Sequence, residues 1–184
     1  MSLPRPTPMH DIPVPRLETE RLILRGPKAD DFDAIRGFVT DAERTRFIGG
    51  PAQTEFDVWS NMMRMIGHWM WNGFGFWTLE DKTSGQPLGR VGVIKHVDWP
   101  EPELGWHLFA TGEGRGLGHE AALRIRDFAA RDLGLDRLIS QIHPDNIRSR
   151  KLAERLGAFV EKESELMGEP CLIYRHPSVL EEAL

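Results

Sequence analysis

One short segment constrains this chain more than any other: a glycine-rich loop that joins a predicted strand to a predicted helix. Four of the seven residues from Gly112 to Gly118 are glycine. Glycine adopts backbone conformations with positive φ and lets backbone N–H groups approach a ligand closely. The free N–H groups and the dipole of the following helix favour an anion, to which Arg115 can add a charge-assisted contact. A flexible turn is the alternative interpretation of such a loop taken alone.

Two common nucleotide-binding frameworks do not fit this loop. An ATP-binding loop ends in Gly-Lys-Ser or Gly-Lys-Thr, and neither triplet occurs in the sequence. A dinucleotide-binding loop needs a third glycine at the position of His119. The dinucleotide fold also begins with alternating strands and helices, whereas this loop follows predicted antiparallel strands. The loop therefore suits a diphosphate held by a different framework.

The hydrophobic pattern predicts one mixed α/β domain. Alternating or continuous apolar runs predict strands, and apolar residues at helical spacing predict helices. The predicted strands cover residues 17–25, 74–79, 88–96, 103–109, 137–142, 159–162 and 172–174. The predicted helices cover residues 30–40, 54–72, 117–133 and 146–156. An antiparallel meander followed by a strand–helix–strand unit places this chain in the mixed class.

A proline-rich arm precedes this domain. Residues 1–16 hold five prolines, which predict an extended or disordered segment: Pro4, Pro6, Pro8, Pro13 and Pro15. Residues 17–184 show no internal repeat and no linker, so they are expected to form a single domain with one sizeable core.

Composition and charge indicate the compartment and the partners. The chain has 184 residues, a formal net charge of −5 and one cysteine, Cys171. A lone thiol forms no internal disulfide, which favours a reducing, cytoplasmic location and a buried packing role for Cys171. The acidic balance argues against nucleic acid as a partner. No apolar run approaches the roughly 20 residues of a membrane span. The histidines lack metal-ligand spacing, so no metal is expected.

Three motifs in consistent order resemble the GNAT acyltransferase family. The loop Glu113-Gly114-Arg115-Gly116-Leu117-Gly118 is similar to the family signature Q/R-x-x-G-x-G/A. Residues 143–157, HPDNIRSRKLAERLG, resemble the segment N-x-x-S-x-x-L/V-x-E-x-L/R-G. Residues 17–25, LETERLILR, resemble the RimJ/RimL-type branch, which acetylates protein N-termini and other amines. The resemblance covers residues 17–176, nearly the whole domain.

The resemblance implies the GNAT fold, with acetyl-CoA as cofactor and coenzyme A as product. This fold has a central mixed sheet of six or seven strands flanked by about four helices, with a splayed parallel pair, here 103–109 and 137–142. The pantetheine arm would lie in the splay and the diphosphate on residues 114–119. The implied cofactor-binding residues are Leu108, Phe109, Gly114, Arg115, Gly116, Leu117, Gly118, His119 and Asn146. Glu113 departs from the signature, because the broad family has Gln or Arg there.

Acetyl transfer to an amine needs a base for the amine, a donor for the carbonyl oxygen and an acid for the thiolate. Glu103 is the predicted base, directly or through a water, and a solvated glutamate is the alternative interpretation. His107 shares the face of Glu103 and is the second candidate base. Ser149 of the N-x-x-S pattern is the predicted acid, because the only tyrosine, Tyr174, falls on an unsuitable strand. Asn146 is expected to cap its helix and to bind pantetheine amides.

The sequence thus predicts an acetyl-CoA-dependent N-acetyltransferase that works by direct attack in a ternary complex. The acceptor stays open among protein N-termini, free amino acids, polyamines and antibiotics, with specificity expected in residues 30–71 and in a loop over residues 163–171. A non-catalytic acyl-CoA-binding domain is one alternative. A dimeric interaction module built on the methionines and tryptophans of residues 58–71 is another, and a homodimer is also compatible with the enzyme.

Overall fold

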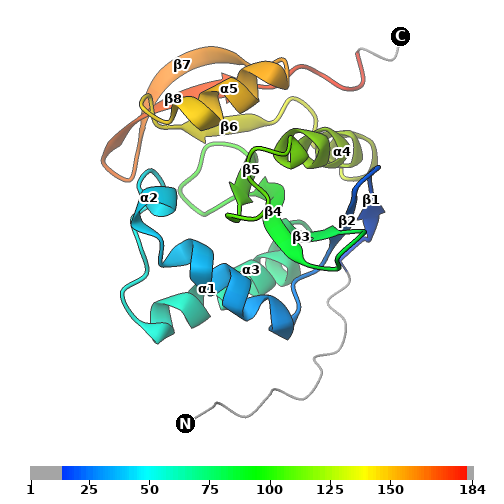
Figure 1. Cartoon of the computed structure of the whole chain (residues 1–184). Coiled ribbons are helices and arrows are strands. Elements are labelled where there is room, and N and C mark those ends of the chain that lie inside the picture. The colour runs from blue at the N-terminus through cyan, green and yellow to red at the C-terminus, as the bar shows by residue number, and fades with distance from the viewer. Residues whose placement is uncertain (1–13, 182–184) are drawn as a thin grey trace.

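The computed structural model of the protein describes residues 14–181 as one sheet with helices on both sides (Figure 1). Its strands are β1 (Leu17–Glu18), β2 (Leu22–Arg25), β3 (Phe76–Asp81), β4 (Pro87–Ile94), β5 (Glu103–Leu108), β6 (Ile139–Ile142), β7 (Phe159–Leu166) and β8 (Glu169–Arg175). Its helices are the short 3-10 helix η1 (Ala29–Asp31), α1 (Phe32–Val39), α2 (Ala42–Thr45), α3 (Glu55–Asn72), α4 (Leu117–Asp132) and α5 (Ile147–Arg155). The predicted mixed α/β class is confirmed. Of the predicted arm, residues 1–13 lie outside the described residues.

The strands form one sheet in the order β1-β2-β3-β4-β5-β6-β8-β7. Every neighbouring pair is antiparallel except the central pair, β5 and β6, which is parallel. The register of this pair contains a single position, Glu103 opposite Ile139. The splayed parallel pair that the resemblance implied is therefore confirmed, and the two strands leave a gap that widens toward their carboxyl ends.

Apolar clusters lie on both faces of the sheet. On one face, Leu104 of β5 packs in the same cluster as Ile125 of α4. On the other face, Phe76 of β3 joins Phe38 of α1 and Met62 of α3. Figure 1 shows α1 and α3 on one side of the sheet, with α4 and α5 on the other. The gap between β5 and β6 is thus bordered by different helices on its two faces.

Local sequence signals set the helix ends as predicted. The hydroxyl of Thr54 accepts from the N–H of Asp57, while the Asp57 carboxylate accepts from the N–H of Thr54, and this capping box begins α3. Gly73 ends α3 in a left-handed conformation with φ 73°. Asn146 caps α5, because its Oδ1 accepts from the N–H of Ser149 at 3.2 Å.

Helix α3 carries apolar side chains on two faces. The inner face packs into the core through Val58, Met62, Met65 and Trp69. The outer face leaves four large apolar side chains exposed, namely Phe56, Trp59, Met70 and Trp71. The methionines and tryptophans of residues 58–71, on which the alternative of an interaction module was based, are therefore divided between the core and the surface.

The prediction of a single first strand over residues 17–25 is wrong. The chain turns within this segment, because the Thr19 hydroxyl accepts from the N–H of Leu22 at 3.1 Å. The two arms pair as the antiparallel strands β1 and β2. The single turn of α2, capped by Asp41, was not predicted either, since four residues are too few to show a helical period.

The prediction of a loop over residues 163–171 is also wrong. These residues belong to a β7–β8 hairpin whose two-residue turn, Met167 and Gly168, has φ values of 55° and 83°. Strand β7 lies at the sheet edge and exposes nearly all its side chains, so it lacks the alternation that identifies a half-buried strand. The division of residues 17–25 explains why the sheet has eight strands rather than six or seven, and α2 explains why residues 14–181 hold five α-helices rather than four.

Candidate active site

The gap between β5 and β6 leaves one edge of β5 open. The N–H of Phe109 donates to a β4 carbonyl at 2.9 Å, while the carbonyl of Leu104 accepts a hydroxyl hydrogen bond from β6 at 2.6 Å. Backbone groups alternate in direction along a strand, so the N–H and C=O groups of Trp106 and Leu108 face β6. The register with β6 contains no position beyond Glu103, so among the described residues these edge groups have no strand partner.

The glycine loop leads from this open edge into the N-terminus of α4. Gly114 and Gly116 have φ values of 71° and 76°, which glycine adopts without strain. Gly116 is the N-cap of α4, and no side-chain hydrogen bond caps this helix, whereas α3 and α5 carry side-chain caps. The N–H groups of residues 117–119 are therefore open to an anion. The ring of His119 ties this first turn to α5, since its Nε2 lies 3.2 Å from the carbonyl oxygen of Arg155.

Two further glycines of the loop are required by close packing. A Cβ on Gly112 would lie 2.1 Å from the carbonyl oxygen of Leu88. A Cβ on Gly118 would lie 3.0 Å from the side chain of Leu108 and 3.3 Å from that of Leu152. Glycine therefore lets α4 begin close to β5 and α5, which brings its open N-terminus to the mouth of the gap.

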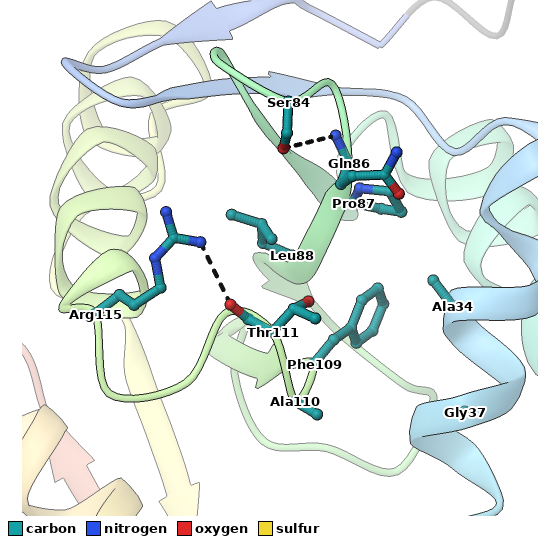
Figure 2. Close-up of a pocket in the computed structure, with 10 residues that line it drawn as sticks. All are labelled: Ala34, Gly37, Ser84, Gln86, Pro87, Leu88, Phe109, Ala110, Thr111 and Arg115. Carbon is teal, nitrogen blue, oxygen red and sulfur yellow. Dashed lines mark hydrogen bonds between the residues drawn. The ribbon is translucent and has the colours of Figure 1, made fainter.

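The side chain of Arg115 extends toward the β3–β4 hairpin. Its Nη2 pairs with Asp81 at 3.0 Å, and its Nη1 donates to the carbonyl of Thr111 at 3.3 Å. Figure 2 shows Arg115 at the border of an open hollow of about 460 Å³, on the far side of which lie Ala34 and Gly37 of α1. Because Asp81 already engages this guanidinium, a contact between the Arg115 side chain and phosphate stays a prediction.

Glu113, the irregular first residue of the loop, joins three elements of the fold. Its carboxylate lies 3.3 Å from Nε of Arg44 on α2 and 3.1 Å from Nη2 of Arg148 on α5. A second contact of the α2 segment lies nearby, where the ring of Phe47 stacks on His143 at 4.9 Å between centroids. Sequence reasoning missed both arginines, because Arg44 belongs to no motif and Arg148 occupies an unspecified position of the N-x-x-S segment.

Glu103 lies at the narrow end of the gap and is only 8% exposed. Nε2 of Gln141, on the opposite strand β6, donates to its Oε2 at 2.8 Å. Burial raises the pKa of Glu103 from 4.5 to about 8, while the hydrogen bond from Gln141 acts in the opposite direction. The interpretation of Glu103 as a solvated glutamate is therefore wrong. A carboxyl that titrates near neutral pH is suited to general base catalysis.

His107 has its proton-accepting nitrogen engaged. Nε of Arg90 donates to His107 Nδ1 at 2.8 Å, and the imidazole ring stacks on Phe38 and contacts Phe76. Burial, together with the Arg90 cation, holds the pKa of His107 well below its ordinary value of 6.5. The lone pair that a base needs is therefore occupied. Arg90 itself is buried, and its Nη1 donates to Oδ1 of Asn61 on α3 at 2.8 Å.

Ser149 and Glu103 lie on opposite faces of the sheet beside the same gap. The indole N–H of Trp106, on β5, donates to Oγ of Ser149 at 3.2 Å. This contact leaves the Ser149 hydroxyl proton free to be donated. Asn146 caps the same helix through its Oδ1 alone, so its amide N–H groups remain for a ligand. The structure therefore brings Ser149 to β5, and Asn146 begins the same helix.

Tyr174 and Cys171 have packing roles. The Tyr174 hydroxyl accepts from Nε of Arg150 at 3.1 Å and donates to Glu154 at 3.4 Å, so it is held beneath α5 and is 1% exposed. Cys171 is buried, and burial with Glu103 nearby raises the pKa of its thiol to about 11. A protonated, buried thiol agrees with the packing role predicted for it.

Residues 14–181 show neither a cluster of metal ligands nor a membrane-spanning helix. Across this part of the chain, no group of three or more His, Cys, Asp or Glu side chains is placed to hold a metal ion. The helices described there include none with the length and apolar character needed to cross a membrane.

Comparisons with known proteins show which family the chain belongs to. The family model described as an acetyltransferase (GNAT) domain matches residues 21–158. The crystal structure of an acetyltransferase from Agrobacterium tumefaciens is 32% identical, covers 95% of this chain and 100% of its own, and superposes with a TM-score of 0.82. The N-acetyltransferase p20 of Bacillus licheniformis is 27% identical over 144 residues, which span 77% of this chain and 80% of that protein. The ribosomal-protein-S5-alanine acetyltransferase of Vibrio fischeri shares the fold, with 18% identity, a TM-score of 0.68 and coverage of 90% of this chain and 98% of its own. The chain therefore belongs to the GNAT family of acetyltransferases.

Proposed function

We propose that this protein transfers an acetyl group from acetyl-CoA to a primary amine by direct attack in a ternary complex, in the cytoplasm. The arrangement around the gap carries the proposal: an open strand edge on β5 ends at the buried carboxyl of Glu103. An open edge suits an extended ligand with amide groups, because such a ligand can bind as an added strand. A buried carboxyl with a pKa of about 8 suits an amine that must lose its proton.

The residues around the gap fit acetyl-CoA. Pantetheine contains two amide groups, which match the free backbone groups of Trp106 and Leu108, and the amide N–H groups of Asn146, at the start of the helix that carries Ser149, are further donors. The diphosphate matches the uncapped N-terminus of α4 at residues 117–119. When bound, the cofactor supplies the acetyl thioester and a sulfur leaving group.

Two side chains would move the protons of the reaction. Glu103, as the carboxylate, takes the proton from the amine nitrogen as this nitrogen bonds to the acetyl carbon and the carbon–sulfur bond breaks. Ser149 gives its hydroxyl proton to the leaving sulfur and recovers one from solvent. The indole N–H of Trp106, 3.2 Å from Oγ, supports the serine oxygen while this proton leaves. The backbone N–H groups on the open β5 edge are the donors available to the carbonyl oxygen.

The acceptor would approach from the face where α1 and α3 lie, because the side chain of Glu103 lies on that face. Specificity then rests with residues 30–71 and with the β7–β8 hairpin. A hollow of about 230 Å³ beside this hairpin is lined by Glu163, Ser164 and Cys171, among others. A shared fold with a ribosomal-protein acetyltransferase makes peptide N-termini one acceptor class to test, alongside small amines.

Titration calorimetry with acetyl-CoA and a thiol-release assay test the proposal together. The acceptor panel contains N-terminal peptides, amino acids, polyamines and aminoglycosides. We expect acetyl-CoA to bind and at least one amine to release thiol, with a loss of about 10²–10⁴-fold in kcat for Glu103→Gln. Binding without thiol release across the panel would support a non-catalytic acyl-CoA-binding domain instead. Failure of acetyl-CoA to bind would overturn the cofactor assignment.

A further inference from the structure

We propose that Glu113 is an internal counter-ion of the cofactor site: it neutralises Arg44 and Arg148 in the free protein, and the diphosphate of acetyl-CoA takes over both guanidinium groups. The inference rests on the proposed function, because it assigns the cofactor's diphosphate to the glycine loop. It gives a role to the one loop residue that departs from the family signature.

Glu113 lies in the loop that leads to the open N-terminus of α4, and two arginines pair with it. It stands three residues before Gly116, the N-cap of the uncapped helix α4. Its Oε1 faces Nε of Arg44 at 3.3 Å, and its Oε2 faces Nη2 of Arg148 at 3.1 Å. An anion at this helix terminus would meet the carboxylate as a like charge and the two arginines as opposite charges.

Burial differs between the two arginines. The side chains of Glu113 and Arg44 are 23% and 25% exposed, whereas that of Arg148 is 79% exposed. An ion pair in solvent contributes little stability, so Arg148 can leave Glu113 at low cost and turn to a phosphate. A phosphate offers stronger, bidentate pairing than a single carboxylate contact.

The charges of the cluster determine the sign of the effect. Arg44 also pairs with Asp41, the cap of α2, so two cations and two carboxylates meet here and the net charge is zero. Neutralising Glu113 would leave one net positive charge beside the open N-terminus of α4. Glu113 therefore weakens cofactor binding relative to an uncharged residue at this position.

The same cluster links the cofactor loop to α2. Arg44 lies on α2, and the neighbouring Phe47 stacks on His143, which follows β6. The α2 segment thus contacts both walls of the gap at its wide end, through Glu113 after β5 and His143 after β6. Displacement of Arg44 by the diphosphate would alter this bridge, which belongs to the region where acceptor specificity is expected.

Calorimetric titration of Glu113→Gln with acetyl-CoA and with dephospho-CoA tests the inference. We expect Kd to fall about fivefold at low salt for both ligands, the effect of removing one unit charge near an exposed anion site. This gain in affinity should be smaller at high salt, because salt screens exposed charges. Glu20→Gln is the matched control, because Glu20 is exposed and the substitution changes the net charge by the same amount.

Arg148→Gln provides the second arm of the experiment. It should raise Kd, and should raise it more in the Glu113→Gln background, where Arg148 is not neutralised. An unchanged or higher Kd for Glu113→Gln overturns the inference. Dephospho-CoA keeps the diphosphate and lacks only the 3′-phosphate of coenzyme A. If Glu113→Gln binds acetyl-CoA more tightly but not dephospho-CoA, the assignment to the diphosphate is overturned. If the wild type binds neither ligand, the proposed function fails instead.

Discussion

Replacing Glu103 with glutamine is expected to stabilise the protein above neutral pH while removing most of its activity. The folded protein keeps the Glu103 proton up to about pH 8, whereas a carboxyl with the ordinary pKa of 4.5 loses it in the unfolded chain. Between these values the folded state binds the extra proton, so the free energy of unfolding falls as the pH rises. The pKa values of about 8 in the folded state and 4.5 in the unfolded state differ by about 3.5 units. At 1.36 kcal/mol per unit, the free energy of unfolding is therefore lower by about 5 kcal/mol above pH 8.

Glutamine at this position does not titrate, and its side-chain oxygen can still accept from Nε2 of Gln141. The contribution of Glu103 to the pH dependence should therefore disappear in Glu103→Gln. For a domain of this size, 1 kcal/mol corresponds to a shift in Tm of about 2–4 °C, so the variant should melt at least about 10 °C above the wild type at pH 8.5. Near pH 4 the two proteins should melt at similar temperatures, because the carboxyl is protonated in both states.

Thermal denaturation from pH 4 to pH 9, combined with the thiol-release assay, measures both effects. Glu101→Gln is the matched control, because Glu101 pairs with Arg175 at 2.7 Å and this contact lowers its pKa. Glu101→Gln should melt below the wild type at neutral pH and approach it in acid. Its Tm difference from the wild type is therefore opposite in sign to that of Glu103→Gln. A Tm difference for Glu103→Gln that stays constant with pH, or full activity in this variant, would refute the reasoning.

Four further variants, at three positions, test the loop, the start of α5 and the contact between β5 and Ser149. Gly112→Ala should cost about 2–3 kcal/mol in the free energy of unfolding, because its Cβ would meet the carbonyl of Leu88 at 2.1 Å, and an unaltered denaturant midpoint would contradict this. Asn146→Ala should lower the free energy of unfolding by about 1 kcal/mol, because it removes the α5 cap. Asn146→Ser should keep the cap and still bind acetyl-CoA more weakly in calorimetry. An affinity equal to that of the wild type for Asn146→Ser would exclude the Asn146 amide from the cofactor site. Trp106→Phe removes the indole N–H that contacts Ser149, together with part of the ring, and leaves the backbone groups of β5 in place; it should lower kcat but not the calorimetric Kd for acetyl-CoA, and a retained kcat would show that this contact is dispensable.

The sequence was informative where a local signal determines the backbone. The four glycines, the capping residues Thr54 and Asn146 and the alternation in β5 act over a few residues, and the structure confirms the elements that they predict. The order of these elements also predicted the splayed central pair, although only through a resemblance. Residue types at fixed spacing are enough for such features, because the forces involved are local.

Properties that arise from tertiary contacts could not be predicted in the same way. The high pKa of Glu103 needs its burial against Gln141, which lies 38 positions further along the chain. The engagement of His107 by Arg90 depends on a cross-strand register. The extension of β7 beyond residue 162 escaped prediction because an exposed edge strand has no apolar alternation. In the first two cases the decisive neighbour is distant in sequence. In the third, exposure to solvent removes the apolar pattern by which a strand is recognised.

The single Glu103–Ile139 pair between β5 and β6 also has a consequence for cooperativity. Strands β1–β5 and strands β6–β8 form two well-paired blocks, and the backbone ladder between them has one rung. Amide protons on the open β5 edge should therefore exchange with solvent faster than those facing β4. A ligand that lies along this edge would act as the missing strand, and at 100 times its Kd it would add about 2.7 kcal/mol to global stability. Protection from exchange should then spread from one block to the other, so that the two blocks unfold as a single unit only in the complex.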